Sequence, residues 1–176
     1  MVLFDCDFLC FLCHDNPGVV LSPTTRKPVE KAPEKIKNLL NHLEAKRKKI
    51  IIPTPALSEF LCLTANNAHE ILDVLTNTYG FELAAFDTMA AVEAAIATSS
   101  AVAKGAKKGG SKSTWAKVKF DRQIIAIAKT RGVSTIYSND DDVRRYAKKD
   151  GMEVIPLWSL PEPPPDQPLL PNLEVP

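Results

Sequence analysis

The sequence predicts an α/β fold, a three-layer sandwich in which a central parallel sheet of about five strands is flanked by helices. Short apolar segments alternate along the chain with longer segments whose apolar residues repeat at helical spacing. Strands separated by helices are joined by right-handed crossovers, which give a parallel sheet covered on both faces. The 176 residues, 45% hydrophobic and 24% charged, suffice for one substantial core.

Five apolar segments are short enough for buried strands. They are expected at residues 2–4, 50–53, 81–86, 133–138 and 153–158. The first reads VLF and the second IIIP, and such nearly continuous apolar runs are typical of strands that are buried on both faces.

Six longer segments are predicted to be helical. They cover residues 34–49, 56–66, 67–80, 88–103, 114–132 and 140–151. In EKIKNLLNHLEAKRKK (34–49) apolar residues repeat at helical spacing, and basic residues gather at the end, where the helix dipole favours cations. Thr54, followed by Pro55, and Asp87 are candidate N-caps of two other helices.

The chain is expected to form one domain over residues 1–158, followed by a proline-rich tail over residues 159–176. The tail holds seven of the fourteen prolines and cannot form a regular core element. No run of 18 apolar residues appears, and the N-terminus lacks the basic region of a secretory signal. We therefore expect a cytoplasmic protein without a membrane segment.

Three of the four cysteines crowd into eight residues, and the first two of them, Cys6 and Cys10, are expected in or beside the first apolar strand. Cys6, Cys10 and Cys13, with His14, offer zinc ligands, but their spacing is not the two-pair pattern of a structural zinc site. Buried thiols are the favoured interpretation. With Cys62 standing alone, the cysteines form a poor disulfide framework, which is typical of a reducing compartment.

A basic run, KGAKKGGSKSTWAKVK, covers residues 104–119 and contains no acidic residue. Its six lysines are Lys104, Lys107, Lys108, Lys112, Lys117 and Lys119. Such a run is often a solvated loop, but lysines among flexible glycines also meet phosphates, and Trp115 offers a ring on which a base can stack. The sequence leaves both interpretations open.

Acidic residues follow two of the predicted strands. Asp5 and Asp7 come at the end of the first, and NDDD (139–142) follows the fourth. The carboxyl ends of parallel strands meet at one edge of the sheet, where ligands bind. Glu59, in the helix after the second strand, and Asp121, at the head of an apolar stripe, can face the same edge. An ionised carboxylate is costly to bury unless a cation or a hydrogen-bond donor meets it, and Mg²⁺ prefers oxygen ligands of this kind.

Several of these acids also have ordinary structural interpretations. Asp140 and Asp141 are well placed to cap a helix, Asp7 can simply face solvent, and Glu59 can be a helical surface acid. The sequence leaves these alternatives open.

Four segments together resemble the motifs of the PIN domain family, in the right order and at suitable spacings. They read VLFDCDFLCFL, PTPALSEFL, KFDRQIIAIAKTRG and TIYSNDDDVRRYA. The resemblance covers roughly residues 1–157 and rests on the combination of motifs, because each alone is unspecific. It implies a PIN-like fold and a Mg²⁺- or Mn²⁺-dependent endoribonuclease. Many members of the family are toxins of VapBC-type toxin–antitoxin pairs.

The resemblance also assigns roles to residues. The expected catalytic acids are Asp5, Glu59, Asp121 and Asp140. The expected metal ligands are Asp5, Asp121, Asp140 and the accessory acid Asp142, while Glu59 orients a metal-bound water. Expected substrate contacts are Ser138, Asn139, Lys107, Lys108 and Lys119. Asp7 departs from the family pattern, because a small neutral polar residue is usual at its position.

The resemblance further implies partners for the chain. RNA is the expected substrate. An antitoxin protein would present a helix or an extended segment to the pocket edge and reach the acids with an arginine. A homodimer is also expected from the family.

Two other functions compete with this one. LFDCDFL also resembles the first motif of haloacid-dehalogenase phosphatases, with Asp5 as nucleophile, but the Phe8-Leu9 pair does not fit that pattern. The phosphatase interpretation also leaves Glu59 and Asp121 unexplained. The third interpretation is a PIN-like module that binds RNA or protein without cutting.

Overall fold

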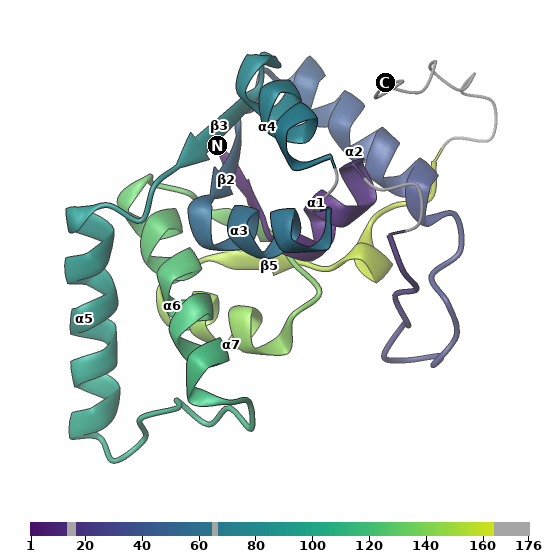
Figure 1. Ribbon diagram of the computed structural model, residues 1–176. Helices are drawn as coiled ribbons and strands as arrows, with labels where there is room; N and C mark the ends of the chain where they lie inside the picture. The colour runs from purple at the N-terminus through teal and green to yellow at the C-terminus, as the bar shows by residue number, and fades with distance from the viewer. Residues whose placement is uncertain (14–16, 65–66, 164–176) are drawn as a thin grey trace.

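The computed structural model describes residues 1–13, 17–64 and 67–163 of the chain, built around one five-stranded sheet (Figure 1). The strands are β1 (Val2–Phe4), β2 (Ile50–Pro53), β3 (Phe81–Ala84), β4 (Thr135–Tyr137) and β5 (Glu153–Ile155). They lie in the order β3-β2-β1-β4-β5, and every neighbouring pair is parallel. The predicted parallel sheet of about five strands is confirmed.

Seven α-helices and one short 3₁₀ helix are found in the described residues. They are α1 (Cys6–Cys13), α2 (Ala32–Ala45), α3 (Thr54–Leu63), α4 (Ala68–Asn77), α5 (Thr88–Ala103), α6 (Trp115–Thr130), α7 (Asp141–Lys149) and η1 (Leu157–Ser159). All six predicted helices are present, and α1 is an addition to them.

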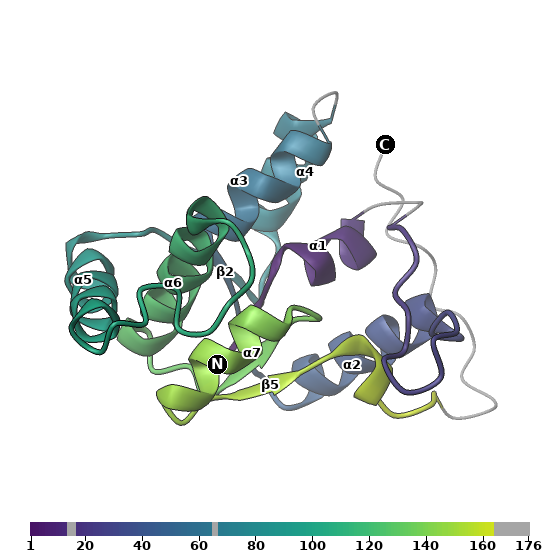
Figure 2. The same cartoon turned by 90° about the horizontal axis from the view of Figure 1, so that it is seen from below.

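The connections place helices on both faces of the sheet. From β1 the chain moves through β2 to β3 in one direction, and it then returns to the other side of β1 for β4 and β5. Right-handed crossovers put α1–α4 on one face and α5–α7 on the opposite face. Figure 1 shows these two groups above and below the strands, and Figure 2 shows α5 outermost, beside α6. The predicted three-layer sandwich is confirmed.

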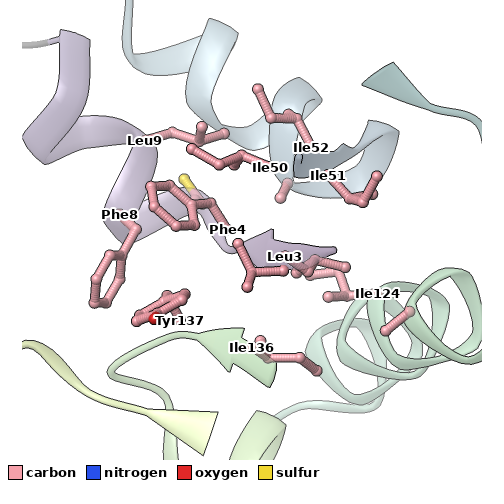
Figure 3. Packing of buried hydrophobic residues seen from close by; sticks show 14 of the residues in the cluster. Leu3, Phe4, Phe8, Leu9, Ile50, Ile51, Ile52, Ile124, Ile136 and Tyr137 are labelled. Atoms are coloured by element: carbon pink, nitrogen blue, oxygen red, sulfur yellow. The ribbon is translucent and has the colours of Figure 1, made fainter. Parts of the chain in front are cut away.

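The core fills the space between β1, β4 and the helices. Leu3, Ile51 and Ile136, on adjacent strands, are fully buried. Beside them the rings of Phe4, Phe8 and Tyr137 pack with centroid separations of 5.3 to 5.5 Å (Figure 3). Tilted aromatic contacts of this kind add to the stabilisation from buried area. The core therefore fixes β1, β4 and α1 against one another.

The segment after Phe4 is helical, which corrects the expectation that Cys6 and Cys10 lie in or beside a strand. Asp5 accepts a hydrogen bond from the Cys6 N–H through its carboxylate (2.8 Å) and from the Leu9 N–H through its carbonyl (3.2 Å), so that the helix begins there. Both cysteines are buried in the core. A short run that is apolar except for Asp7 cannot be assigned to strand or helix by periodicity alone. The fourth residue of the zinc alternative, His14, lies outside the described residues.

Several predicted boundaries also change. The helix predicted over 34–49 spans Ala32–Ala45, because Arg47 adopts a left-handed backbone (φ 50°) as the chain turns into β2. The last predicted strand ends at Ile155, before Pro156, and gives way to η1.

The two predicted N-caps have different outcomes. Asp87 caps α5 by accepting a hydrogen bond from the Ala90 N–H (3.0 Å). Thr54 does not cap α3: it is the first residue of that helix, and its hydroxyl accepts instead from the Phe86 N–H (3.0 Å). Thr54 thereby ties α3 to the segment after β3.

The start of the proline-rich tail packs on the domain. Leu160 is buried, and Glu162 forms an ion pair with the buried Lys35 of α2 (2.9 Å). Residues 164–176 lie outside the described part of the chain, so the tail boundary at 158 stays a prediction. Over the described residues, none of the helices has the length and apolar character needed to cross a membrane.

Candidate functional site

Acidic side chains meet at the carboxyl edge of the two central strands. Asp5 directly follows β1, and residues 138–142 follow β4, the parallel neighbour of β1. The chain direction across the sheet reverses between these two strands, and such switch points are where open parallel sheets bind ligands. The helices α3 and α6 bring Glu59 and Asp121 to the same edge.

Asp5 is buried and held by two hydrogen bonds. Its Oδ1 accepts from the Cys6 N–H at 2.8 Å, and its Oδ2 accepts from the Ser138 hydroxyl at 2.7 Å. Burial raises the pKa of Asp5, and the charges of Asp140 and Glu59 raise it further, against these hydrogen bonds. Glu59 itself is exposed, at the rim. The Asp5 carboxylate is therefore rigidly placed in a region that disfavours its charge.

Asp140 caps the helix α7. Its Oδ1 accepts from the Asp142 N–H at 2.6 Å and from the Val143 N–H at 3.3 Å. Its own N–H donates to the Ser138 hydroxyl at 3.1 Å, which links it to Asp5. The capping role anticipated for Asp140 is confirmed, and its Oδ2 is left to point away from the helix.

Asp121 is the most deeply buried of these acids, with 4% of its surface exposed. Burial raises its pKa to about 6, although Lys117, one helical turn earlier, opposes the rise. Its Oδ1 lies 3.1 Å from the Lys117 Nζ, and its Oδ2 is buried with no hydrogen-bond partner among the described residues. A buried carboxylate oxygen without a partner is costly, so this atom calls for a cation.

Lys117 lies between two of the acids. Its Nζ is 3.1 Å from Asp121 Oδ1 and 2.5 Å from Asp140 Oδ2. Partial burial lowers the pKa of Lys117, but the hydrogen bonds and charges of Asp140 and Asp121 outweigh it and raise the pKa overall. The ammonium is therefore charged and shared by Asp121 of α6 and Asp140, the N-cap of α7.

Asp142 is also buried but has partners of its own. Its Oδ2 accepts from the hydroxyls of Ser111 (2.5 Å) and Ser113 (2.6 Å), and its Oδ1 pairs with Arg145. Burial alone would raise the pKa of Asp142, but these hydrogen bonds and the Arg145 charge lower it. Asp142 thus fastens the loop before α6 to the start of α7.

Asp7 is half-buried and does not simply face solvent. It accepts hydrogen bonds from the Asn139 N–H (2.7 Å) and the Phe8 N–H (2.9 Å). Burial, and then the charge of Asp5, raise the pKa of Asp7 to about 8. It therefore connects α1 to the turn after β4.

The predicted substrate contacts fall into two groups. Ser138 is fully buried between Asp5 and Asp140, and the Asn139 side chain accepts from the Leu157 N–H (2.8 Å). Lys107, Lys108 and Lys119 are exposed, and their contact with substrate stays a prediction.

The predicted basic run is an ordered loop joined to α6. Lys107 lies over the Trp115 ring (4.5 Å), and its carbonyl accepts from the Arg122 guanidinium (2.6 Å). Trp115 and Lys119 line a hollow of about 330 Å³ between α5 and α6. The Trp115 ring already contacts two cations, since Arg122 lies 5.5 Å from its centroid.

The donor set fits a hard divalent cation. Oxygens of Asp121, Asp140 and Asp142 lie within 4.8 Å of one another, and Asp5 is joined to Asp140 through Ser138. Carboxylate oxygens without nitrogen or sulfur donors suit Mg²⁺ or Mn²⁺. The partnerless Asp121 Oδ2 adds independent support, because it is buried beside these acids.

Sequence reasoning missed the cation within the cluster and the two serines. The sequence presents Lys117 as part of a basic run. Its position four residues before Asp121 is nevertheless a signal in the sequence, since residues at this spacing share a helix face. No local pattern marks Ser111 and Ser113, because their partner Asp142 lies some thirty residues further on.

A family model described as PIN domain matches residues 29–149. The matched segment contains Glu59, Asp121, Asp140 and Asp142, whereas Asp5 precedes it. A comparison with curated proteins finds no match.

Solved structures share the fold at low sequence identity. They include DNA-bound VapBC from Salmonella typhimurium, with 16% identity, a TM-score of 0.55 and coverage of 89% of this chain and 97% of that one. VapBC2 from Rickettsia felis bound to a promoter DNA fragment has 14% identity, a TM-score of 0.58 and coverage of 89% and 98%. FitAB bound to an IR36 DNA fragment has 16% identity, a TM-score of 0.56 and coverage of 92% and 99%. The family model covers more than half of the sequence and the fold agrees with it: this chain belongs to the PIN domain family.

Proposed function

We propose that this chain is a Mg²⁺- or Mn²⁺-dependent endoribonuclease that hydrolyses phosphodiester bonds in RNA, with its catalytic domain over residues 1–158. The observation that carries the proposal is the meeting of Asp5, Asp121 and Asp140 at one sheet edge, where a buried Asp121 oxygen has no partner among the described residues. Membership of the PIN domain family supports the same chemistry.

Asp5, Asp121 and Asp140 would hold the divalent ion. The ion would supply charge stabilisation at the scissile phosphate and an activated water. Ser138 positions two of these ligands, because its hydroxyl donates to Asp5 and accepts from the Asp140 N–H. Asp142, whose oxygens are engaged by serines and Arg145, contributes mainly by holding this edge together.

Glu59 is the acid that would orient the attacking water. Its carboxylate is exposed at the rim, yet close enough for its charge to raise the pKa of Asp5. An ionised carboxylate in this position can accept a hydrogen bond from a water and orient it towards a phosphate. We assign this role to Glu59.

Exposed lysines in and after the basic loop suit an RNA strand. Lys107, Lys108 and Lys119 are exposed, and exposed ammonium groups are sufficient to contact the phosphates of a nucleic acid. We assign them to the RNA backbone. Asn139 belongs with them as a substrate contact at the end of β4.

Protein partners are part of the proposal. The similar structures are described as VapBC and FitAB assemblies bound to DNA. We propose that this chain likewise pairs with an antitoxin and forms a homodimer. Four free cysteines suit the reducing cytoplasm, where we place the protein.

The test is a cleavage assay on single-stranded RNA in Mg²⁺, in Mn²⁺ and in EDTA. Wild type is compared with Asp5→Asn and Asp140→Asn, and with Asp141→Asn as a matched control. Asp141 lies next to Asp140, but its side chain is 79% exposed and pairs with Arg144 on the surface. Metal-dependent cleavage that is lost in the first two variants and kept in the control is the expected result.

Two other outcomes point elsewhere. p-Nitrophenyl phosphate is run in parallel. Its hydrolysis while RNA stays intact would favour the phosphatase alternative, although membership of the PIN domain family does not support that alternative. RNA binding without hydrolysis of either compound would identify a non-catalytic binding module.

A further inference from the structure

The acidic site already contains a cation that belongs to the chain. Lys117 Nζ lies 2.5 Å from Asp140 Oδ2 and 3.1 Å from Asp121 Oδ1. These are two of the three acids to which the proposed function assigns a divalent ion.

The start of α6 holds Lys117 in this place. Thr114 caps the helix by accepting a hydrogen bond from the Lys117 N–H (3.3 Å), which fixes Lys117 in the first turn. Lys117 and Asp121 are four residues apart and share a face of the helix. The ammonium reaches Asp140 because α6 packs against α7. The contact is therefore built by two elements and does not depend on a mobile surface side chain alone.

Lys117 and a divalent ion would need the same oxygens. Asp140 Oδ1 is committed to the N–H groups of α7, which leaves Oδ2 for a cation, and Oδ2 is the atom that Lys117 contacts. A divalent ion held by Asp140 and Asp121 would also meet the like charge of Lys117, which is unfavourable. Both cations cannot occupy this position together.

We propose that Lys117 is an internal counter-ion of the site, which neutralises Asp121 and Asp140 in the metal-free protein and has to leave Asp140 before a divalent ion binds. This inference rests on the proposed function. It gives the chain a built-in competitor that lowers its affinity for metal and keeps the acids assembled without metal.

The first test is a calorimetric titration of the full-length, metal-free protein with MnCl₂. Lys117→Met removes the charge and keeps most of the side-chain volume. We expect it to bind Mn²⁺ about tenfold more tightly than wild type, as expected when two partly exposed ion pairs no longer compete. The readout is a dissociation constant and does not require activity.

The control is Lys129→Met. Lys129 lies on the same helix, about 18 Å further along its axis. Its side chain is 47% exposed, against 43% for Lys117, and it also forms an ion pair, with Glu93 at 2.6 Å. Because Lys129 is remote from the acids, the control should bind Mn²⁺ as wild type does.

A second measurement uses the wild-type protein and so does not depend on the folding of a variant. Lysines are acylated briefly with an amine-reactive ester, with and without MnCl₂, and each site is quantified by mass spectrometry. The counter-ion role predicts that Mn²⁺ increases the labelling of Lys117 severalfold and leaves Lys129 unchanged.

The possible results separate the two proposals. Equal or weaker Mn²⁺ binding by Lys117→Met, or Lys117 labelling that does not rise with Mn²⁺, would overturn the counter-ion role while leaving the metal site intact. Absence of Mn²⁺ binding in all three proteins would overturn the proposed metal-dependent function and this inference with it.

Discussion

Asp142 and Asp121 are both buried, and their carboxylate oxygens belong to one group that spans 4.8 Å, yet their surroundings differ. Asp142 accepts hydrogen bonds from two serines and pairs with Arg145, and its pKa is lowered. Asp121 has one oxygen against Lys117 and the other without a described partner, and burial raises its pKa to about 6.

The difference separates two roles. Asp142 is a structural anchor, whereas Asp121 is a candidate metal ligand. A buried carboxylate with enough donors stabilises the fold around it, and its removal leaves those donors unpaired. A buried carboxylate with too few donors costs stability, and it is tolerated where a bound ion completes the site. Burial and proximity alone do not distinguish these roles, but the hydrogen-bond partners do.

The largest expected effect is on cleavage. Asp121→Asn removes the charge but keeps the shape, and we expect it to lower the RNA cleavage rate at least about 10²-fold, because charge stabilisation at the phosphate is lost. The metal-free variant should unfold at the same temperature as wild type or higher, since a poorly solvated charge has gone. Cleavage kinetics and thermal unfolding check the two parts. Unaltered cleavage would remove Asp121 from the catalytic set.

The anchor should behave in the opposite way. Asp142→Ala leaves Ser111, Ser113 and Arg145 without their acceptor, and we expect it to lower the free energy of unfolding by about 2 kcal/mol. Denaturant titration measures this. Asp141→Ala, a surface acid of the same helix, should cost no more than about 0.5 kcal/mol. Equal losses in the two variants would mean that the Asp142 contacts contribute little.

A smaller effect should appear in the pH dependence of stability. The folded-state pKa values of Asp121 (about 6) and Asp7 (about 8) lie above the ordinary 3.8. Their contribution is fully present below about pH 4 and is lost as the pH rises through 6 and then 8. We expect the free energy of unfolding of the metal-free protein to fall between pH 4 and pH 8 by at least about 1.4 kcal/mol, the equivalent of one pKa unit.

Denaturant titration in EDTA at several pH values measures this loss. Asp7→Asn should flatten the part of the curve near pH 8, and Asp141→Asn should leave the curve unchanged. Stability that rises with pH over this range would contradict the assignment of raised pKa values to the buried acids.

The sequence predicted the sheet and the edge at which the acids meet, for a physical reason. Parallel strands end at a common edge, so residues that follow β1 and β4 lie at that edge. They meet there because β1 and β4 are neighbours, an order that the sequence did not predict. It did not predict α1, because CDFLCFLC is apolar except for Asp7 and too short to show a helical periodicity. The three-residue β1 was predicted from its apolar run VLF.

The distinction between anchor and ligand could not be predicted from the sequence. It depends on which hydrogen-bond donors reach each carboxylate. That is decided by the course of the loop before α6 and by the rotamers of the side chains. Ser111 and Ser113 look like ordinary loop residues, and Lys117 looks like one lysine among six. The family match does not supply the distinction either, since it contains Asp121 and Asp142 alike.

The smallest expected effect concerns the loop that the anchor holds. Asp142 fixes Ser111 and Ser113, Tyr146 donates to the Lys108 carbonyl (2.8 Å), and Lys107 and Lys108 are thereby presented at the surface. Lys107→Ala with Lys108→Ala should weaken binding to single-stranded RNA severalfold and reduce the slope of log affinity against log salt by about 1 to 2, since about 0.7 counterions are released per phosphate contact. Binding titrations at several salt concentrations measure both quantities, in EDTA so that the RNA stays intact.

Asp142→Ala tests whether the Asp142 contacts position these lysines for RNA. The variant loses a negative charge, which by itself would strengthen RNA binding. Weaker RNA binding by Asp142→Ala would therefore be evidence that Asp142 positions the loop lysines. An unchanged affinity and slope in the lysine variant would exclude the loop from the RNA path and leave Lys119 as the remaining candidate on α6.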